Sequence, residues 1–163
     1  MTARLNALRW LDQLGIAYAV RDFPDAIHSA DGVADHLGLP RALVYKTLVA
    51  LAPGDKPVLV MLAGDRTLDL KRLARALGVK DVRMAGHAAA ERLTGLQTGG
   101  ISPLALAHRP WPVYIDAAAL ALPGGRMLVS AGRRGVNVEL AVADLVRATG
   151  AVAVDAASPA SPS

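Results

Sequence analysis

The chain has 163 residues, of which 53% are hydrophobic and 20% are charged, so it is suited to one domain with a packed core. The absence of cysteine excludes disulfides, thiolate metal sites and a cysteine nucleophile. A net charge of +4 is compatible with a polyanionic partner, whereas an aromatic content of 4% argues against an RNA-binding platform of stacked rings.

Apolar spacing predicts the elements of the N-terminal half of the chain. Leucine at every third residue indicates an opening helix, and Ser29 and Thr67 are suitable N-caps for two later helices. The turn sequence PGDKP between two apolar segments indicates a β-hairpin. The predicted order is a helix over 5–14, a strand over 16–23, a helix over 29–37, strands over 43–52 and 58–62, and a helix over 67–78.

The C-terminal half contains three predicted strands with helices on either side. The predicted order is a strand near Val82, a helix over 88–93, a loop over 98–105, strands over 112–116, 126–130 and 136–140, a helix over 142–148 and a strand over 151–155. The lack of strict alternation and the hairpins favour a mixed α+β fold, with a largely antiparallel sheet wrapped by helices. We expect one domain over 1–154 and a disordered tail over 155–163.

Lys46 stands in the middle of the apolar segment LVYKTLVAL. Strand alternation places it on one face with Val44, Leu48 and Ala50, and both faces of this strand are predicted to be buried. An unpaired buried ammonium group is energetically unfavourable. Lys46 therefore either extends its amine to solvent or lies at the floor of a pocket, as a cation for an anionic or hydroxyl-bearing ligand.

The segment TGGISPLA, residues 98–105, places flexible and stiff backbone side by side. Gly99 and Gly100 can adopt positive φ and expose their amides, whereas Pro103 fixes its own φ and restricts Ser102. Such a loop can direct amides at a carbonyl or phosphate oxygen. A plain connection between a helix and a strand has the same composition, so the pattern leaves both interpretations open.

The segment VSAGRRGVNVEL, residues 129–140, predicts a hairpin with Arg133 and Arg134 at its tip. We expect Arg134 in a solvated turn. If the tip faces the glycine loop, Ser130 and Asn137 point inward from neighbouring strands. A second basic group is typical of a solvated helix face but also of contact with a phosphate backbone; its members are Lys71, Arg72, Arg75, Lys80 and Arg83.

Several kinds of site are not indicated. The histidines have no partner at i, i+4 and no useful acidic spacing, so we expect no metal, no other cofactor and no Ser-His-Asp triad. No segment approaches the ~20 apolar residues that cross a bilayer. The N-terminal residues also lack the pattern of a signal peptide, so we expect a soluble cytoplasmic protein without membrane contact.

Three of these segments, in this order, resemble the YbaK family, which is related to the editing domain inserted in bacterial prolyl-tRNA synthetases. They are the strand VYKTLV, the loop TGGISPL and the hairpin VSAGRRGVNVEL, and the similarity extends from about residue 4 to residue 154. The resemblance implies an aminoacyl-tRNA deacylase that acts in trans on mischarged tRNA, Cys-tRNA(Pro) in the YbaK branch. The implied partner is the 3′ end of an aminoacyl-tRNA, with prolyl-tRNA synthetase as a second candidate.

The resemblance also assigns roles to residues. The lysine of the family's KTL motif matches Lys46 and is tied most closely to activity, and the family's Gly-x-x-x-Pro loop, which holds the aminoacyl end, matches residues 99–103. In the YbaK branch the substrate's thiol attacks its own ester, so positioning supplies the rate. The predicted site has Lys46 as the catalytic residue and these substrate-binding residues: Phe23, Thr47, Gly99, Gly100, Ile101, Ser102, Pro103, Ser130, Gly132, Arg133 and Asn137.

The sequence departs from the family pattern near the implied amino-acid pocket. Phe23 replaces a common Tyr, Asn137 a common Asp, Gln97 and Thr98 common apolar residues, and Ala105 a common Gly. These differences bear on the preference for cysteine more than on the deacylase activity. The alternatives are a deacylase for another amino acid, a module that binds the tRNA end or a nucleotide-like ligand without turnover, and a Schiff-base enzyme that uses its lysine.

Overall fold

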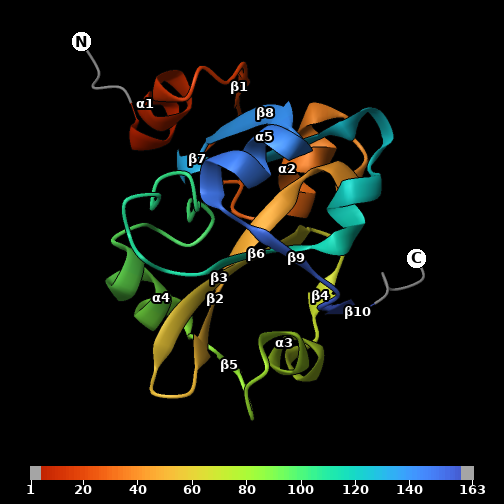
Figure 1. The fold of residues 1–163 in the computed structure, drawn as a ribbon. Helices are drawn as coiled ribbons and strands as arrows, with labels where there is room; N and C mark the ends of the chain where they lie inside the picture. The colour runs from red at the N-terminus through yellow and green to blue at the C-terminus, as the bar shows by residue number, and fades with distance from the viewer. Residues whose placement is uncertain (1–4, 159–163) are drawn as a thin grey trace.

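The computed structural model describes residues 5–158 (Figure 1). Its α-helices are α1 (Asn6–Gln13), α2 (Ala30–Leu37), α3 (Leu70–Leu77), α4 (His87–Thr94) and α5 (Val142–Thr149). Short 3-10 helices lie at Arg41–Leu43, Ala117–Ala121 and Pro123–Gly125. The strands are β1 (Ala19–Asp22), β2 (Tyr45–Ala52), β3 (Lys56–Ala63), β4 (Thr67–Leu68), β5 (Arg83–Met84), β6 (Val113–Asp116), β7 (Arg126–Arg133), β8 (Val136–Ala141), β9 (Val152–Val154) and β10 (Ala157–Ser158). No helix in this part of the chain is long and apolar enough to span a membrane.

The strands form two principal sheets and one short pair. The larger sheet has the order β5-β2-β3-β6-β9; β2 runs antiparallel to β5 and β3, whereas β3, β6 and β9 are parallel. The smaller sheet, β1-β8-β7, is antiparallel throughout, and β10 pairs with β4. A parallel bridge between Val44 and Leu128 joins the two principal sheets. The predicted mixed, largely antiparallel α+β fold is therefore confirmed.

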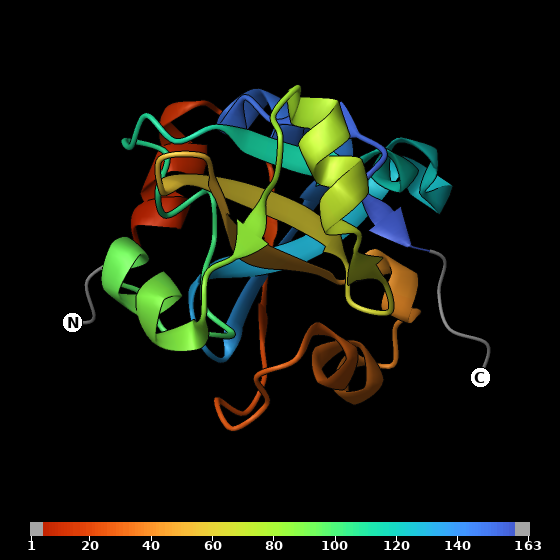
Figure 2. The same cartoon turned by 90° about the horizontal axis from the view of Figure 1, so that it is seen from below.

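The β2–β3 hairpin is covered on both faces. Ala50 and Val58 pack with Leu73 of α3 on one face, and Val49 packs with Ala90 of α4 on the other. Figure 2 shows the hairpin passing between these two helices. Since successive residues of a strand point to opposite faces, a strand covered on both sides has a nearly continuous apolar sequence.

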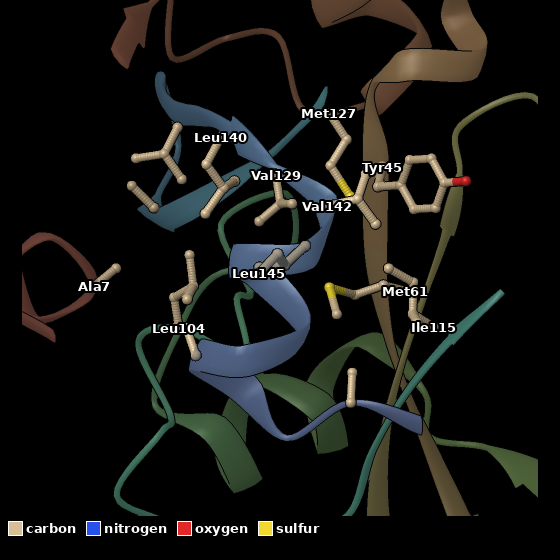
Figure 3. Packing of buried hydrophobic residues seen from close by; sticks show 14 of the residues in the cluster. Ala7, Tyr45, Met61, Leu104, Ile115, Met127, Val129, Leu140, Val142 and Leu145 are labelled. Carbon is tan, nitrogen blue, oxygen red and sulfur yellow. The ribbon is translucent and has the colours of Figure 1, made fainter. Parts of the chain in front are cut away.

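The largest core cluster lies where the principal sheets meet α1 and α5. Met61 of β3, Met127 of β7 and Leu145 of α5 are fully buried in it (Figure 3). Tyr45 of β2 packs its ring against this cluster, and its hydroxyl points away from it (Figure 3). That hydroxyl is buried without a hydrogen-bond partner among residues 5–158, and burial raises the pKa of Tyr45. The Tyr45 hydroxyl therefore stays protonated.

The boundaries of most elements agree with the sequence prediction, but the N-cap of α3 does not. The Asp69 side chain, not that of Thr67, accepts the capping hydrogen bond, from the Arg72 amide at 3.1 Å. Thr67 instead lies in β4, where it pairs with Ser158. The prediction failed because both residues are good caps, and a pairing between distant segments decides between them.

The predicted tail begins as ordered structure. Ala156 and Ala157 are buried, and Ala156 packs in the cluster around α3. Its carbonyl accepts a hydrogen bond from the Asp69 amide at 2.7 Å, directly before β10 pairs with β4. Small apolar residues without periodicity can therefore still complete a sheet. The rest of the predicted tail, residues 159–163, lies outside the described residues.

We expect Asp69→Ala to lower the free energy of unfolding by about 1 kcal/mol, because it removes the N-cap acceptor of α3. Thr67→Ala is the matched control and should change stability by less than about 0.5 kcal/mol, since Thr67 is exposed and caps nothing. Urea denaturation followed by circular dichroism measures both values. Equal losses in the two variants would contradict the assignment of the cap.

Candidate functional site

A cavity of about 220 Å³ lies between the first turn of α2, the start of β2 and the ends of β7 and β8. The loop over residues 98–101 forms another wall. Six of the predicted site residues line it: Lys46, Thr47, Gly99, Ile101, Ser130 and Asn137. Segments far apart in the sequence thus bring the Lys46 amine and the glycine loop to one cavity.

Lys46 is half-buried and held by main-chain carbonyls. Its Nζ donates to the carbonyl oxygens of Gly64 at 3.2 Å and Arg66 at 2.6 Å. An ammonium group has three donors, so one N–H remains for a ligand. Burial lowers the pKa of Lys46, and the negative charges of Asp31 and Asp65 oppose that shift. Lys46 is thus a pocket cation, and it does not extend fully into solvent.

The two glycines of the loop have different roles. Gly99 has a φ of +91° and lines the cavity, and a Cβ on it would lie 2.9 Å from the His28 carbonyl oxygen. Gly100 has no positive φ, contrary to expectation, and is buried outside the cavity. A Cβ there would lie 2.9 Å from the amide nitrogen of Arg134. Gly100 therefore allows close backbone packing.

Only some amides of this loop remain available to a ligand. The Thr98 amide donates to the Glu91 carboxylate at 2.7 Å, a bond that lowers the pKa of Glu91, and the Gly100 amide donates to the Gln97 carbonyl at 2.8 Å. Within residues 5–158, the amides of Gly99 and Ile101 have no acceptor. Both residues line the cavity, so these two amides are the candidate backbone donors of the loop for an oxyanion.

Three other predicted contacts lie behind the cavity wall. The Ser102 hydroxyl is fully buried and accepts a hydrogen bond from the Leu104 amide at 3.2 Å. The Pro103 carbonyl accepts one from the Leu106 amide at the same distance, and Gly132 packs against Ala105. Ser102, Pro103 and Gly132, like Gly100, therefore shape the loop and the hairpin and are not among the residues that line the cavity, and their contact with substrate stays a prediction.

Ser130 and Asn137 form a polar pair on the cavity wall. They are register partners on β7 and β8, so their side chains project side by side from one face, and both are buried. The Ser130 hydroxyl accepts a hydrogen bond from the Gly132 amide at 3.0 Å. The side-chain amide of Asn137 makes no hydrogen bond within the described part of the chain, so it is available to a ligand.

Phe23 and Arg133 line a second hollow that adjoins the cavity, and His28 lines both. Phe23 also packs against the apolar cluster of α2. Arg134 lies in the hairpin turn, but it is half-buried and not fully solvated as predicted, because its Nε donates to the Thr98 carbonyl at 2.7 Å and anchors the glycine loop. The exposed Arg133 is the nearby cation free for a ligand outside the cavity.

The second basic group lies partly on α3, which packs on the five-stranded sheet and contributes no residue to the cavity. Arg72 pairs with Asp69 and Asp155, and Arg83 pairs with Asp55. Nothing in this arrangement connects the group to Lys46.

Sequence reasoning missed the acidic surroundings of Lys46. Asp31 and Gly64 line the cavity, and Asp65 is the next residue along the chain. The predicted hairpin could have indicated that residues 64 and 65 lie near Lys46, since Tyr45 pairs with Ala63 and therefore brings Gly64 close to Lys46. Asp31 had no such signal, because its place depends on how α2 packs against the sheet.

The fold is that of a mixed α+β domain, and its cavity is a candidate ligand site with the positively charged Lys46 amine on its wall. The chain belongs to the aminoacyl-tRNA editing domain family, whose sequence model matches residues 24–148. It is 36% identical over 140 residues to a protein of Enterococcus faecalis named "Putative Cys-tRNA(Pro)/Cys-tRNA(Cys) deacylase EbsC", covering 85% of this chain and 84% of that protein.

Longer proteins and solved structures are also similar. A proline--tRNA ligase of Acidithiobacillus ferrooxidans is 41% identical over 70 residues, which is 43% of this chain but 12% of the ligase. The crystal structure of the hypothetical protein APE2540 superposes with a TM-score of 0.84 at 25% identity, covering 94% of this chain and 99% of that one. A structure described as a "putative trans-editing enzyme for prolyl tRNA synthetase" shares the fold, with a TM-score of 0.80 at 23% identity and coverage of 97% and 100%.

We expect Gly100→Ala to destabilise the protein by about 1–3 kcal/mol, because the added methyl group overlaps the backbone of the β7–β8 hairpin. Gly86→Ala is the control: Gly86 has an ordinary φ and nothing within 4 Å, so the loss should be limited to that of Ala for Gly at the N-cap of α4, about 0.5–1 kcal/mol. Thermal unfolding of the two variants tests this. If Gly100→Ala is as stable as the control, Gly100 is not a packing residue.

Proposed function

We propose that the protein is a trans-acting aminoacyl-tRNA deacylase that clears mischarged tRNA, with Lys46 as its catalytic residue. The observation that carries this proposal is the single cavity shared by the Lys46 amine and the amides of Gly99 and Ile101. Membership of the editing-domain family supports the substrate class. The name of the Enterococcus relative, which this chain matches over most of its length, supports the reaction.

The cavity suits the hydrolysis of an ester. An attacked ester carbonyl develops negative charge, and the free amides of Gly99 and Ile101 can stabilise it because they are already held in place. The third N–H of Lys46 can bind the same oxygen or the ribose and phosphate of the leaving tRNA end. Tyr45 is an unsuitable nucleophile, because burial raises the pKa of its hydroxyl and keeps it protonated. Attack by water, or by a thiol of the substrate, fits such a site.

Within this substrate class, we propose that the specific substrate is cysteine esterified to tRNA(Pro). The relative's name points to cysteinyl-tRNA, and a volume of about 220 Å³ suits a small aminoacyl group better than a large one. Val33, Val44 and Leu48 give the cavity apolar walls of the kind that a small side chain can contact. Docking on a prolyl-tRNA synthetase stays a prediction.

The surroundings of Lys46 disfavour a Schiff-base mechanism. That chemistry needs a neutral amine as the nucleophile. Burial lowers the pKa of Lys46, but two carbonyl oxygens accept hydrogen bonds from Nζ and two nearby carboxylates oppose this shift, so the amine is held as a hydrogen-bond donor. We therefore assign Lys46 an electrostatic role.

We expect Lys46→Met to lower the rate of deacylation about 100-fold or more, because among the described residues Lys46 is the one lysine or arginine that lines the cavity. Lys56→Met is the matched control, since Lys56 is an exposed lysine of the same hairpin, and it should keep the wild-type rate. The assay is release of labelled amino acid from a panel of mischarged tRNAs, with circular dichroism to check folding.

The same assay separates the competing functions. Wild-type protein that binds mischarged tRNA but releases no amino acid from any of the panel would be a binding module. Full turnover by a folded Lys46→Met variant would refute the catalytic role of Lys46. Release of another amino acid, but not of cysteine, would keep the deacylase and refute the cysteine assignment.

A further inference from the structure

Two carboxyl groups close to the Lys46 amine lack hydrogen bonds within the described residues. They belong to Asp31, in the first turn of α2, and Asp65, in the connection after β3. The Oδ1 atom of each is buried and has no partner. Buried acceptors are normally paired, because an unmade hydrogen bond there is unfavourable. Two buried carboxylate oxygens that lack hydrogen bonds near the same lysine therefore require an explanation.

Gly64 connects Asp31 to the amine. A Cβ on Gly64 would lie 2.6 Å from Asp31 Oδ1 and 2.7 Å from the Cβ of Ala30, so the first turn of α2 packs directly on the backbone of residue 64. The carbonyl of this same residue accepts a hydrogen bond from Lys46 Nζ. The Asp31 carboxylate and the Lys46 amine therefore meet around one peptide unit.

Asp65 approaches from the chain segment that holds Nζ. It lies between Gly64 and Arg66, whose carbonyl oxygens both accept from Lys46. The outer oxygen of Asp31, Oδ2, lies 3.6 Å from the guanidinium of Arg41 at the surface. Oδ1 is thus the oxygen left for the inner side, where Lys46 supplies a positive charge.

We propose that Asp31 and Asp65 are positioning residues that act together as counter-charges, holding the Lys46 amine protonated and fixed at the wall of the cavity. This inference rests on the proposed function, because it explains how a half-buried lysine keeps the charge that an ester oxyanion or a phosphate needs. Opposite charges stabilise each other strongly where water is partly excluded. The two unpaired oxygens are satisfied by charge, not by a hydrogen bond.

The other groups that face the cavity do not supply this charge. His28 lines it from the segment before α2, and Tyr45 precedes Lys46 on β2. The walls from β7, β8 and the glycine loop contribute no titratable side chain to it. Burial lowers the pKa of Lys46, and Asp31 and Asp65 oppose this shift. Removing either carboxylate therefore lowers that pKa further.

The first test is an NMR titration of the Lys46 ammonium group in lysine-labelled protein, with the signal assigned by its absence in Lys46→Met. In Asp31→Asn and in Asp65→Asn the midpoint should move to lower pH, and it should move furthest in the double variant. Asp144→Asn is the control, because Asp144 pairs with Arg147 on α5 and does not line the cavity. Its midpoint should equal that of the wild type.

The second test is the pH dependence of deacylation. The loss of activity at alkaline pH should begin at lower pH in the same order of variants, with activity retained on the acid side of the Lys46 titration. A purely structural role of the aspartates would lower activity at all pH values without moving this limb. Thermal melts identify any variant that does not fold, and each single variant tests the inference alone.

The two proposals fail in different ways. An unmoved Lys46 midpoint in the folded variants overturns the counter-charge inference, whether or not the wild-type protein is a deacylase. A moved midpoint in a protein that releases no amino acid supports the charge arrangement and overturns the proposed function.

Discussion

One ammonium group inside an apolar strand constrains the rest of the site. β2 packs against helices on both faces from Val49 to Leu51, whereas residues 46–48 near its start are half-buried. There the Lys46 amine needs acceptors, and the chain supplies two carbonyl oxygens just after β3 ends. This arrangement requires a residue without a side chain at position 64, since α2 packs on the same peptide unit. The hairpin register, the glycine and the start of α2 therefore together form the surroundings of this one charge.

The opposite wall of the cavity depends on backbone packing. Gly99 fits against His28, and Gly100 fits against the tip of the β7–β8 hairpin, so the loop is clamped between two other segments. Arg134 adds a hydrogen bond to the Thr98 carbonyl, and Glu91 accepts the Thr98 amide. Such a loop needs little rearrangement when charge develops on a ligand, which is the property that makes amides effective oxyanion donors. On both walls, the groups that line the cavity are therefore held in place by contacts within the protein and do not depend on a ligand.

The sequence predicted the parts of this site that depend on local pattern. Lys46 is conspicuous because strand alternation leaves no apolar role for it, and the PGDKP turn predicts the hairpin that the structure contains. Asp31 and Asp65 were missed because a carboxylate next to a helix cap or after a strand is common at protein surfaces. The sequence did not indicate that Gly100 packs against the β7–β8 hairpin, because contact with a segment distant in the chain has no local signature. The capping role of Asp69 depended likewise on β10, whose residues have no apolar period.

The size and polarity of the cavity limit how selective it can be for an ester. One methylene more or less in an apolar pocket changes binding by about 1–3 kcal/mol, so walls such as Val33 and Leu48 separate similar small side chains only modestly. Polar groups without internal partners discriminate better, because a ligand that fails to pair with them leaves them unsatisfied. Within the described cavity the side-chain amide of Asn137 is such a group, and it carries no charge. Under the proposed function, the adjoining hollow with its exposed Arg133 is a surface that can contact RNA phosphates.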